Sequence, residues 1–171
     1  MSLFAGARNR ILQMLALYSP GGDSLRVTLH RLRGVRIGER TWIGFDTLIE
    51  PSYPARVEIG DRVAIGIRVL ILAHFAHHGR NRETADGAVD ERVSVRIEDD
   101  VFVGPGSIIM PNVTLGAGSV VAAGSVVTRS VAPLTMVQGN PAKPIARCGV
   151  PLGLDTPVKE FYRRLIPIDE A

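Results

Sequence analysis

The chain has 171 residues, which is enough for one domain with a substantial core and too few for two large domains. Hydrophobic residues make up 46% of the chain and aromatic residues only 5%, which favours a core of stacked aliphatic side chains over a β-sandwich. The formal charge is +3, but 20 Lys and Arg residues are interleaved with 17 Asp and Glu residues, so a nucleic-acid-binding surface is not expected. We interpret the small positive excess as phosphate-binding positions for a small ligand.

The cysteine count and the lack of a long apolar segment indicate the cellular compartment in which the protein is expected. Cys148 excludes an intramolecular disulfide, fits a reducing compartment and is expected to be inert. No segment approaches the roughly 20 consecutive apolar residues that span a bilayer. These features predict a cytoplasmic protein.

The first predicted helix covers residues 3–18. Its apolar and polar side chains fall on different faces, with Phe4, Ile11, Leu12 and Leu15 near one face and Arg8, Asn9 and Gln13 on the other. We interpret this segment as a packing helix, and transient contact with a membrane surface stays open as the alternative.

A second predicted helix runs from Ser24 to Arg33. Ser24 can cap its start and Gly34 can end it. Three leucines share one face of this helix: Leu25, Leu29 and Leu32. His30 is expected at the surface.

The central feature of the sequence is a six-residue period. An aliphatic residue opens each unit between residues 95 and 130, at Ile97, Val103, Ile109, Leu115, Val121 and Val127. Two earlier sets have the same phase: Ile37, Ile43 and Ile49, and then Ile59, Ile65 and Ile71. Such a period predicts a solenoid in which each unit is one short strand and one tight corner, paired in parallel with the coils above and below. The pattern gives about four triangular coils.

Two insertions interrupt the period. One adds four residues around positions 51–54, and the other is a long excursion from Ala73 to about Ser94. Insertions in repeat proteins map to surface loops and often to the binding face, so we expect the chemistry at these two places.

Three of the four histidines stand at the start of the long excursion: His74, His77 and His78. A single histidine at a coil corner, directly after a strand, can act as a general base near neutral pH. Metal binding would need ligands that converge from different coils, and the chain has no histidine from residue 79 to residue 171. His77 and His78 taken alone are also compatible with solvated loop positions.

The C-terminal part is expected to cover the open end of the stack. Residues 137–145 predict a turn-rich exit strand. Thr156 and Pro157 are expected to open a last helix that bears Val158, Phe161 and Leu165.

Taken together, the Ile-Gly and Val-Gly hexapeptides, the insertion that begins with His74, and the closing run from Gly124 through Gly139-Asn-Pro-Ala-Lys143 resemble the hexapeptide-repeat acyltransferases. The likeness is greatest to the branch of maltose, galactoside and polysaccharide O-acetyltransferases, and it covers residues 35–147. It implies an all-β fold, a single-stranded left-handed parallel β-helix with short N-terminal and C-terminal helices. The domain would occupy residues 35–147 with an inserted loop at 73–94, between a helical segment at 1–34 and a tail at 148–171. Family members are usually trimers that hold acyl-CoA in a groove between adjacent subunits.

The resemblance also implies roles for individual residues. His74 falls at the position of the family's catalytic base, and Asp46 or Glu50 would orient it or contact the acceptor. On the donor side, the family's contacts to pantetheine and to the CoA phosphates fall on Ala123, Thr128, Arg129 and Lys143. Gly104, which is small like Ala123, would leave the coil edge accessible to pantetheine, and Arg147 is an additional contact. No metal is expected.

Two departures from the family pattern affect these roles. Pro105 stands where relatives have a residue with a backbone N–H, so a backbone oxyanion donor would have to come from a neighbour such as Gly106. The excursion is polar enough to be a lid over the acceptor, through Arg80, Arg82, Glu83, Asp86, Asp90, Glu91 and Arg92.

The predicted function is therefore an acetyl-CoA-dependent O-acetyltransferase that acts on a hydroxyl of a sugar or a saccharide-containing acceptor. Three alternatives stay open. The acceptor could be an amine, an antibiotic or serine; the chain could be a metal-dependent β-helix similar to γ-type carbonic anhydrases; or it could be a non-catalytic trimeric scaffold.

Overall fold

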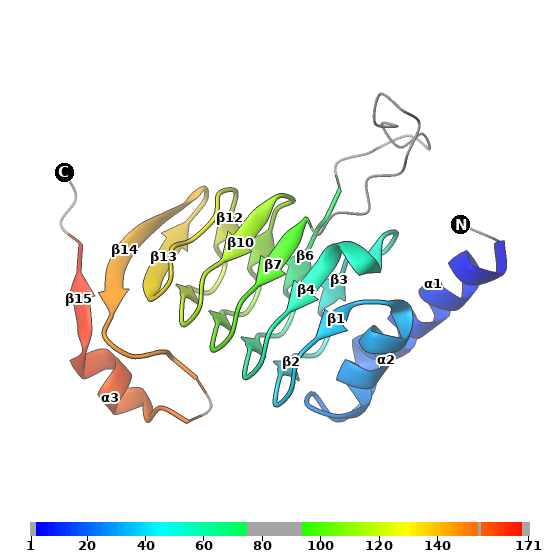
Figure 1. Cartoon of the computed structure of the whole chain (residues 1–171), viewed down its shortest axis with the longest axis horizontal. Coiled ribbons are helices and arrows are strands. Elements are labelled where there is room, and N and C mark those ends of the chain that lie inside the picture. The colour runs from blue at the N-terminus through cyan, green and yellow to red at the C-terminus, as the bar shows by residue number, and fades with distance from the viewer. Residues whose placement is uncertain (1–2, 75–93, 154, 169–171) are drawn as a thin grey trace.

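The computed structural model describes residues 3–74, 94–153 and 155–168. Within these ranges the chain forms a stack of short strands with helices at both ends (Figure 1). No helix in the described part of the chain is long and apolar enough to cross a membrane.

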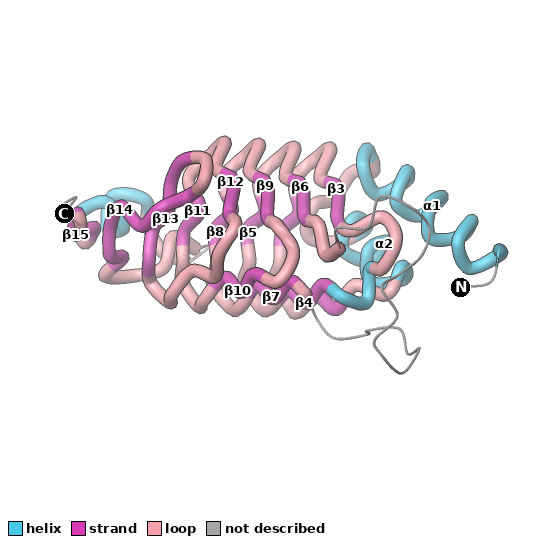
Figure 2. The backbone as a smooth tube through the Cα atoms, turned by 90° about the horizontal axis from the view of Figure 1, so that it is seen from above, coloured by secondary structure: helices cyan, strands magenta, loops and turns pink. Residues whose placement is uncertain are grey.

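The strands lie in three sheets along the sides of the stack (Figure 2). Sheet A contains β1 (Arg36–Ile37), β4 (Val57–Ile59), β7 (Val95–Ile97) and β10 (Val113–Leu115). Sheet B begins with β2 (Trp42–Ile43), β5 (Ala64–Ile65), β8 (Phe102–Val103) and β11 (Val120–Val121). Sheet C contains β3 (Leu48–Ile49), β6 (Leu70–Ile71), β9 (Ile108–Ile109) and β12 (Val126–Val127). All these strands pair in parallel, and the chain visits the three sheets in turn, which confirms the predicted parallel solenoid.

The six-residue period is the period of the core. In sheet B, Ile43, Ile65, Val103 and Val121 stand in register on successive strands, and all four are fully buried. Branched side chains stacked in this way fill the interior and remove apolar surface from water. Corner glycines are needed where coils approach closely: a Cβ on Gly44 would lie 2.5 Å from the backbone nitrogen of Ile67.

Two helices cover the first coil, α1 (Leu3–Tyr18) and α2 (Leu25–Arg33). Gly34 ends α2 in the left-handed conformation with φ 104°, as predicted. Ser24 precedes α2, but its side chain makes no capping hydrogen bond.

The predicted packing faces of these helices were wrong. α2 buries Arg26, Val27, Leu29, His30 and Arg33 and leaves Leu25 and Leu32 exposed, so His30 is an interior residue and not a surface one. The reason is that the first coil is the edge of three sheets, whose carbonyl groups need donors. Arg26 donates to the carbonyl oxygens of Ser19 and Ile43, and Arg33 donates to that of Ile49.

The C-terminal end also differs from the prediction. Sheet B continues through β13 (Thr135–Gly139), the antiparallel β14 (Ala142–Cys148) and β15 (Leu165–Pro167). The exit is thus a hairpin, because the turn at residues 140–141 sends the chain back along β13. The last helix, α3 (Val158–Arg163), ends before Leu165, which lies in β15. Phe161 of α3 packs with Val120 and Cys148 and closes this end of the core.

Candidate functional site

The strands of sheet C all end at one edge of the stack. Ile49, Ile71, Ile109 and Val127 are in register, so the residues that follow them form a row along this edge: Glu50, Leu72, Met110 and Thr128. Parallel strands are about 4.8 Å apart, which places Glu50 and Thr128 roughly 14 Å from each other along the row. The row thus joins the predicted catalytic end of the site to one predicted donor residue.

Glu50 is a fully buried carboxylate with four hydrogen-bond donors. Its Oε1 accepts from the backbone N–H groups of Ser52 at 2.8 Å and Tyr53 at 2.9 Å. Its Oε2 accepts from the backbone N–H of Ala73 at 2.7 Å and contacts Nδ1 of His74 at 2.8 Å. The insertion at residues 51–54 continues into the short 3₁₀ helix η1 (Pro54–Arg56). This insertion therefore folds back over the carboxylate and supplies half of its donors.

His74 is held in one orientation by this carboxylate. Ionised Glu50 can only accept, so Nδ1 of His74 carries the proton and donates it to Oε2, which leaves Nε2 as an unprotonated acceptor. The Tyr53 ring meets the imidazole edge-on, with ring centroids 5.2 Å apart. The His74 side chain keeps 19% of its surface exposed, so the imidazole is fixed and still accessible.

Opposing effects act on the pKa of Glu50. Burial raises the pKa of the carboxyl, but the hydrogen bonds from His74, Tyr53, Ala73 and Ser52 together outweigh burial and bring the pKa below its ordinary value. Glu50 is therefore ionised at neutral pH and lies ready to stabilise a positive charge on His74.

A polar network beneath Glu50 was not predicted from the sequence. Arg33 donates to the carbonyl oxygen of Glu50 at 2.8 Å, to Oδ1 of Asn9 at 2.8 Å, and to Nδ1 of His30 at 2.9 Å. Burial lowers the pKa of Arg33 to about 10, so the guanidinium stays charged at neutral pH. Asn9 in turn donates to the carbonyl oxygen of Pro51 at 2.7 Å. The helical cap thus holds both the residue that precedes the insertion and the insertion itself.

Asp46 lies apart from this pair. It occupies the corner between sheets B and C with φ 56°, and its carboxylate lies 3.5 Å from the guanidinium of Arg68. Its side chain is 47% exposed. The contacts described for His74 involve Glu50 and not Asp46, so the structure separates the two carboxylates that the sequence analysis left as alternatives.

The predicted donor residues lie on two corners of the stack. Gly104 and Ala123 follow strands of sheet B. Gly104 is buried, and a Cβ there would lie 2.5 Å from the backbone nitrogen of Ala123, so only glycine fits. Ala123 itself is exposed. Thr128 and Arg129 follow β12 of sheet C and are both exposed. Within one chain these four residues therefore lie on two different corners of the stack.

The two remaining donor candidates lie on β14. Lys143 pairs across the hairpin with Gln138 and is exposed, while Nη1 of Arg147 donates to the hydroxyl of Thr135 at 2.9 Å. Among the residues that the structure describes, Arg129 and Lys143 form no ion pair. Both residues are exposed, as a contact with an anionic ligand requires.

The expected oxyanion donor is corrected by the structure. The backbone N–H of Gly106 already donates to the carbonyl oxygen of Ile67 at 2.9 Å, as part of the pairing between coils. Gly106 is therefore not free to replace the missing donor of Pro105.

His77, His78 and the charged residues of the proposed lid lie outside the described residues. Of the long excursion, the structure describes Ala73 and His74 at its start and Ser94 at its end.

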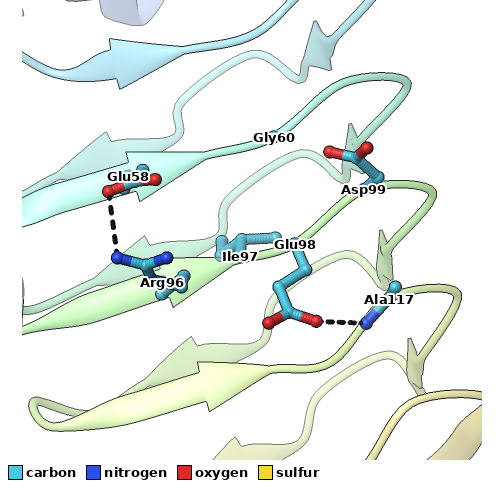
Figure 3. Close-up of a pocket in the computed structure, with 7 residues that line it drawn as sticks. All are labelled: Glu58, Gly60, Arg96, Ile97, Glu98, Asp99 and Ala117. Carbon is cyan, nitrogen blue, oxygen red and sulfur yellow. Dashed lines mark hydrogen bonds and ion pairs between the residues drawn. The ribbon is translucent and has the colours of Figure 1, made fainter.

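A surface depression on sheet A is unrelated to the histidine pair. Figure 3 shows its lining, with Glu58 facing Arg96 and Glu98 bonded to the backbone N–H of Ala117. The depression lies over β4 and β7, whereas Glu50 and His74 follow strands of sheet C. Each of its charged side chains already has a partner, because Glu58 pairs with Arg96 while Glu98 and Asp99 accept from backbone N–H groups.

The stack of short parallel strands and the hexapeptide pattern are typical of hexapeptide-repeat transferases, and comparisons with known proteins point to the same class. The family model described as bacterial transferase hexapeptide (six repeats) matches residues 94–129. Galactoside O-acetyltransferase of Escherichia coli is 30% identical over 113 residues, which are 65% of this chain and 53% of that protein. Serine acetyltransferase 4 of Arabidopsis thaliana is 34% identical over 136 residues, which are 80% of this chain and 34% of that protein. The chain thus spans only a third to a half of the length of these two relatives.

A solved structure extends the likeness over most of the chain. The hexapeptide-repeat containing acetyltransferase of Vibrio cholerae, crystallised with acetyl coenzyme A, is 28% identical with a TM-score of 0.63, and the match covers 84% of this chain and 87% of that one. The chain thus carries the bacterial transferase hexapeptide repeat and is similar in sequence and fold to hexapeptide-repeat acetyltransferases.

Proposed function

We propose that this protein is an acetyl-CoA-dependent O-acetyltransferase that modifies a hydroxyl of a sugar or of a saccharide-containing acceptor. The observation that supports this most strongly is the 2.8 Å contact between Nδ1 of His74 and the buried carboxylate of Glu50. It gives His74 the tautomer that a general base needs, at a chain corner where the imidazole is accessible.

In the proposed reaction, Nε2 of His74 accepts the proton of the acceptor hydroxyl as the hydroxyl oxygen attacks the carbonyl carbon of the thioester. The carbon–sulfur bond then breaks, and the departing CoA sulfur takes the proton back from His74, which yields the acetyl ester and free CoA. Glu50 orients the imidazole and stabilises its positive charge between the two proton transfers. Asp46 is assigned a contact with the acceptor, because its exposed carboxylate is not bonded to His74.

On the donor side we assign pantetheine contacts to Gly104, Ala123 and Thr128, and phosphate contacts to Arg129, Lys143 and Arg147. The separation of these residues onto two corners favours a site shared between adjacent subunits, and we therefore propose a homotrimer. A left-handed winding of about four coils, with the domain at residues 35–147, completes the proposed architecture; the parallel sheets are compatible with it.

An acceptor screen tests the proposal directly. The purified chain is incubated with acetyl-CoA and a panel of sugars, nucleotide sugars and oligosaccharides, and released CoA thiol is measured with a chromogenic reagent. We expect turnover with at least one saccharide and a loss on the order of 10²–10⁴ in kcat for His74→Ala, with part of it restored by added imidazole. Full turnover by His74→Ala would show that the assigned base is wrong. Absence of both turnover and saturable CoA binding would favour the non-catalytic scaffold.

Serine is the competing acceptor. The 34% identity to a serine acetyltransferase over 80% of this chain is the observation that favours it. Including free serine in the same panel distinguishes the two proposals, because a serine-specific enzyme would release CoA with serine and not with saccharides.

A further inference from the structure

The helix α1 is turned so that its polar face points inward. Asn9 and Gln13 are 7% and 5% exposed, and Ala16 is fully buried. Asn9 uses its amide to contact Pro51 and Arg33, as described above. The demand for hydrogen bonds at the edge of the first coil therefore fixes the orientation of α1, and its apolar face is left to the outside.

The outer face of α1 carries a continuous set of large apolar side chains. Their exposed fractions are 86% for Phe4, 57% for Ile11, 68% for Met14, 54% for Leu15 and 72% for Tyr18. Offsets of 7, 11 and 14 residues from Phe4 are close to whole numbers of helical turns, so these residues form one stripe. Figure 1 places α1 beyond the first coil, at the end of the stack. An exposed apolar stripe of this kind marks an interaction site.

The charges beside the stripe identify its partner. Arg8 and Arg10 are both exposed and lie on opposite borders of the stripe, while the sequence of α1 contains no Asp or Glu. An isologous pair of α1 helices would bring these arginines next to their copies, with no carboxylate on either helix to compensate. Anionic lipid headgroups supply the missing negative charge, and the acyl boundary beneath them accepts the apolar side chains.

The length of α1 fixes how it would lie. Its 16 residues span about 24 Å, which is less than the roughly 30 Å of a bilayer's hydrocarbon core. With polar residues bonded to the solenoid on the inner side, only the outer face is available, so the helix axis must lie in the plane of the surface.

We propose that the outer face of α1 attaches this protein peripherally to anionic membranes, with the apolar stripe at the acyl boundary and Arg8 and Arg10 on lipid phosphates. This inference is independent of the acetyl-transfer proposal.

Vesicle co-sedimentation with the full chain tests it. We expect binding to mixed phosphatidylcholine–phosphatidylglycerol vesicles, little binding to phosphatidylcholine alone, and weaker binding as NaCl is raised. Replacing both Arg8 and Arg10 by Gln should weaken binding about thirtyfold, at about 1 kcal/mol for each arginine near the surface. Ile11→Glu combined with Leu15→Glu should abolish binding.

A matched control uses exposed apolar residues at the opposite end of the stack. Val158→Glu combined with Ile166→Glu, at positions 59% and 63% exposed, should leave vesicle binding unchanged. Circular dichroism and thermal melting verify that each variant folds. The proposal is overturned if the wild-type chain binds no vesicles, or if the Ile11 and Leu15 variant keeps its vesicle binding. It is also overturned if that variant lowers the mass in light scattering while the wild type does not bind lipid, because the stripe would then join copies of the chain.

Discussion

The two ends of the proposed site differ in how far one chain completes them. At the first two coils, Glu50 is buried with four donors and His74 is fixed against it, so the geometry of the proposed base exists in the single chain. At the last coils, Thr128, Arg129 and Lys143 are exposed, and the two cations form no ion pair with a described residue. Under the proposed function, the single chain would pre-organise the base, and the donor side would be completed by acetyl-CoA and by the adjacent subunit of the proposed trimer.

The difference has a physical cause. A base must present one nitrogen in one tautomer, and a buried ionised carboxylate achieves this only if its other lone pairs are satisfied. Phosphate groups, in contrast, are bound well by long charged side chains at the surface, which need no burial to be selective for negative charge. Substitutions at the proposed catalytic end should therefore lower kcat, whereas substitutions at the proposed donor end should raise the KM for acetyl-CoA.

The largest effect is expected for Glu50→Gln. An amide NH2 in place of Oε1 would face the donating backbone N–H groups of Ser52 and Tyr53, whereas in place of Oε2 it would face His74 and one backbone N–H. We expect the second orientation, because it leaves fewer donors opposed, and it would move the proton of the imidazole to Nε2. We expect kcat to fall on the order of 10²–10⁴, with the KM for acetyl-CoA nearly unchanged. Nitrogen-15 NMR of the imidazole, which reports the tautomer without any acceptor, should show the change directly.

Glu39→Gln is the control for this substitution, since Glu39 is highly exposed and its carboxylate forms a surface ion pair with Arg31. It should leave both kcat and the His74 tautomer as they are in the wild type. A wild-type tautomer in Glu50→Gln would remove Glu50 from its orienting role.

Much of the solenoid could be predicted from the sequence, and the cap could not. A six-residue period of aliphatic residues permits few arrangements, so Ile43, Ile65, Val103 and Val121 were correctly placed in the core. The same reasoning failed for α2, because helical periodicity sorts side chains by hydrophobicity. The edge of the first coil instead selects donors, which turned Arg33 and His30 inward.

The candidate site, like the helical cap, could be predicted from the sequence only in part. His74 and Glu50 were both proposed from the sequence, but their contact depends on pairing between β3 and β6, which are 22 residues apart in register. The residue types alone do not distinguish Glu50 from Asp46. The local signal that does is the four-residue insertion directly after Glu50, since its backbone N–H groups need an acceptor.

The second-largest effect is expected on the free energy of unfolding. The buried His30, near the proposed catalytic end, should make the fold less stable at acidic pH. Burial, and then the nearby charges of Arg33 and Arg26, lower the pKa of His30 to about 3. Below its ordinary value of about 6.5, the unfolded chain takes up a proton that the folded chain refuses, so stability should fall by a few kcal/mol as the pH drops from about 6.5 toward 3. Urea unfolding across this range measures the loss.

His30→Asn separates this effect from that of Glu50. Asn keeps an acceptor near the position of Nδ1 but does not titrate, so the variant should lose much less stability between about pH 6.5 and 5. The contribution of Glu50, whose pKa is lowered by folding, is present above its ordinary value of about 4.3 and is lost only as the pH falls further. An equally steep loss in His30→Asn between pH 6.5 and 5 would contradict this assignment.

A smaller and different effect is expected at the donor end. Arg129→Ser and Lys143→Ser should each raise the KM for acetyl-CoA about tenfold and leave kcat within about twofold, because a charge-assisted contact to phosphate contributes about 1.5 kcal/mol. Lys159→Ser on α3 serves as the charge-matched control and should not change the KM. A fall in kcat at constant KM would move Arg129 and Lys143 out of the donor site and would remove the contrast between the two ends.

The smallest effect is expected for Asp46→Asn. Asp46 has φ 56°, and Asn accepts this left-handed conformation as readily as Asp, so the fold should be unchanged. Because the carboxylate lies 3.5 Å from Arg68 and is not bonded to His74, we expect kcat to change by less than about threefold and the KM for the acceptor to rise by up to about tenfold. Steady-state kinetics with the acceptor found in the screen provides both constants. A loss of kcat as large as that of Glu50→Gln would make Asp46 part of the proton-transfer machinery, and would show that the site rearranges on binding so that both carboxylates act on His74.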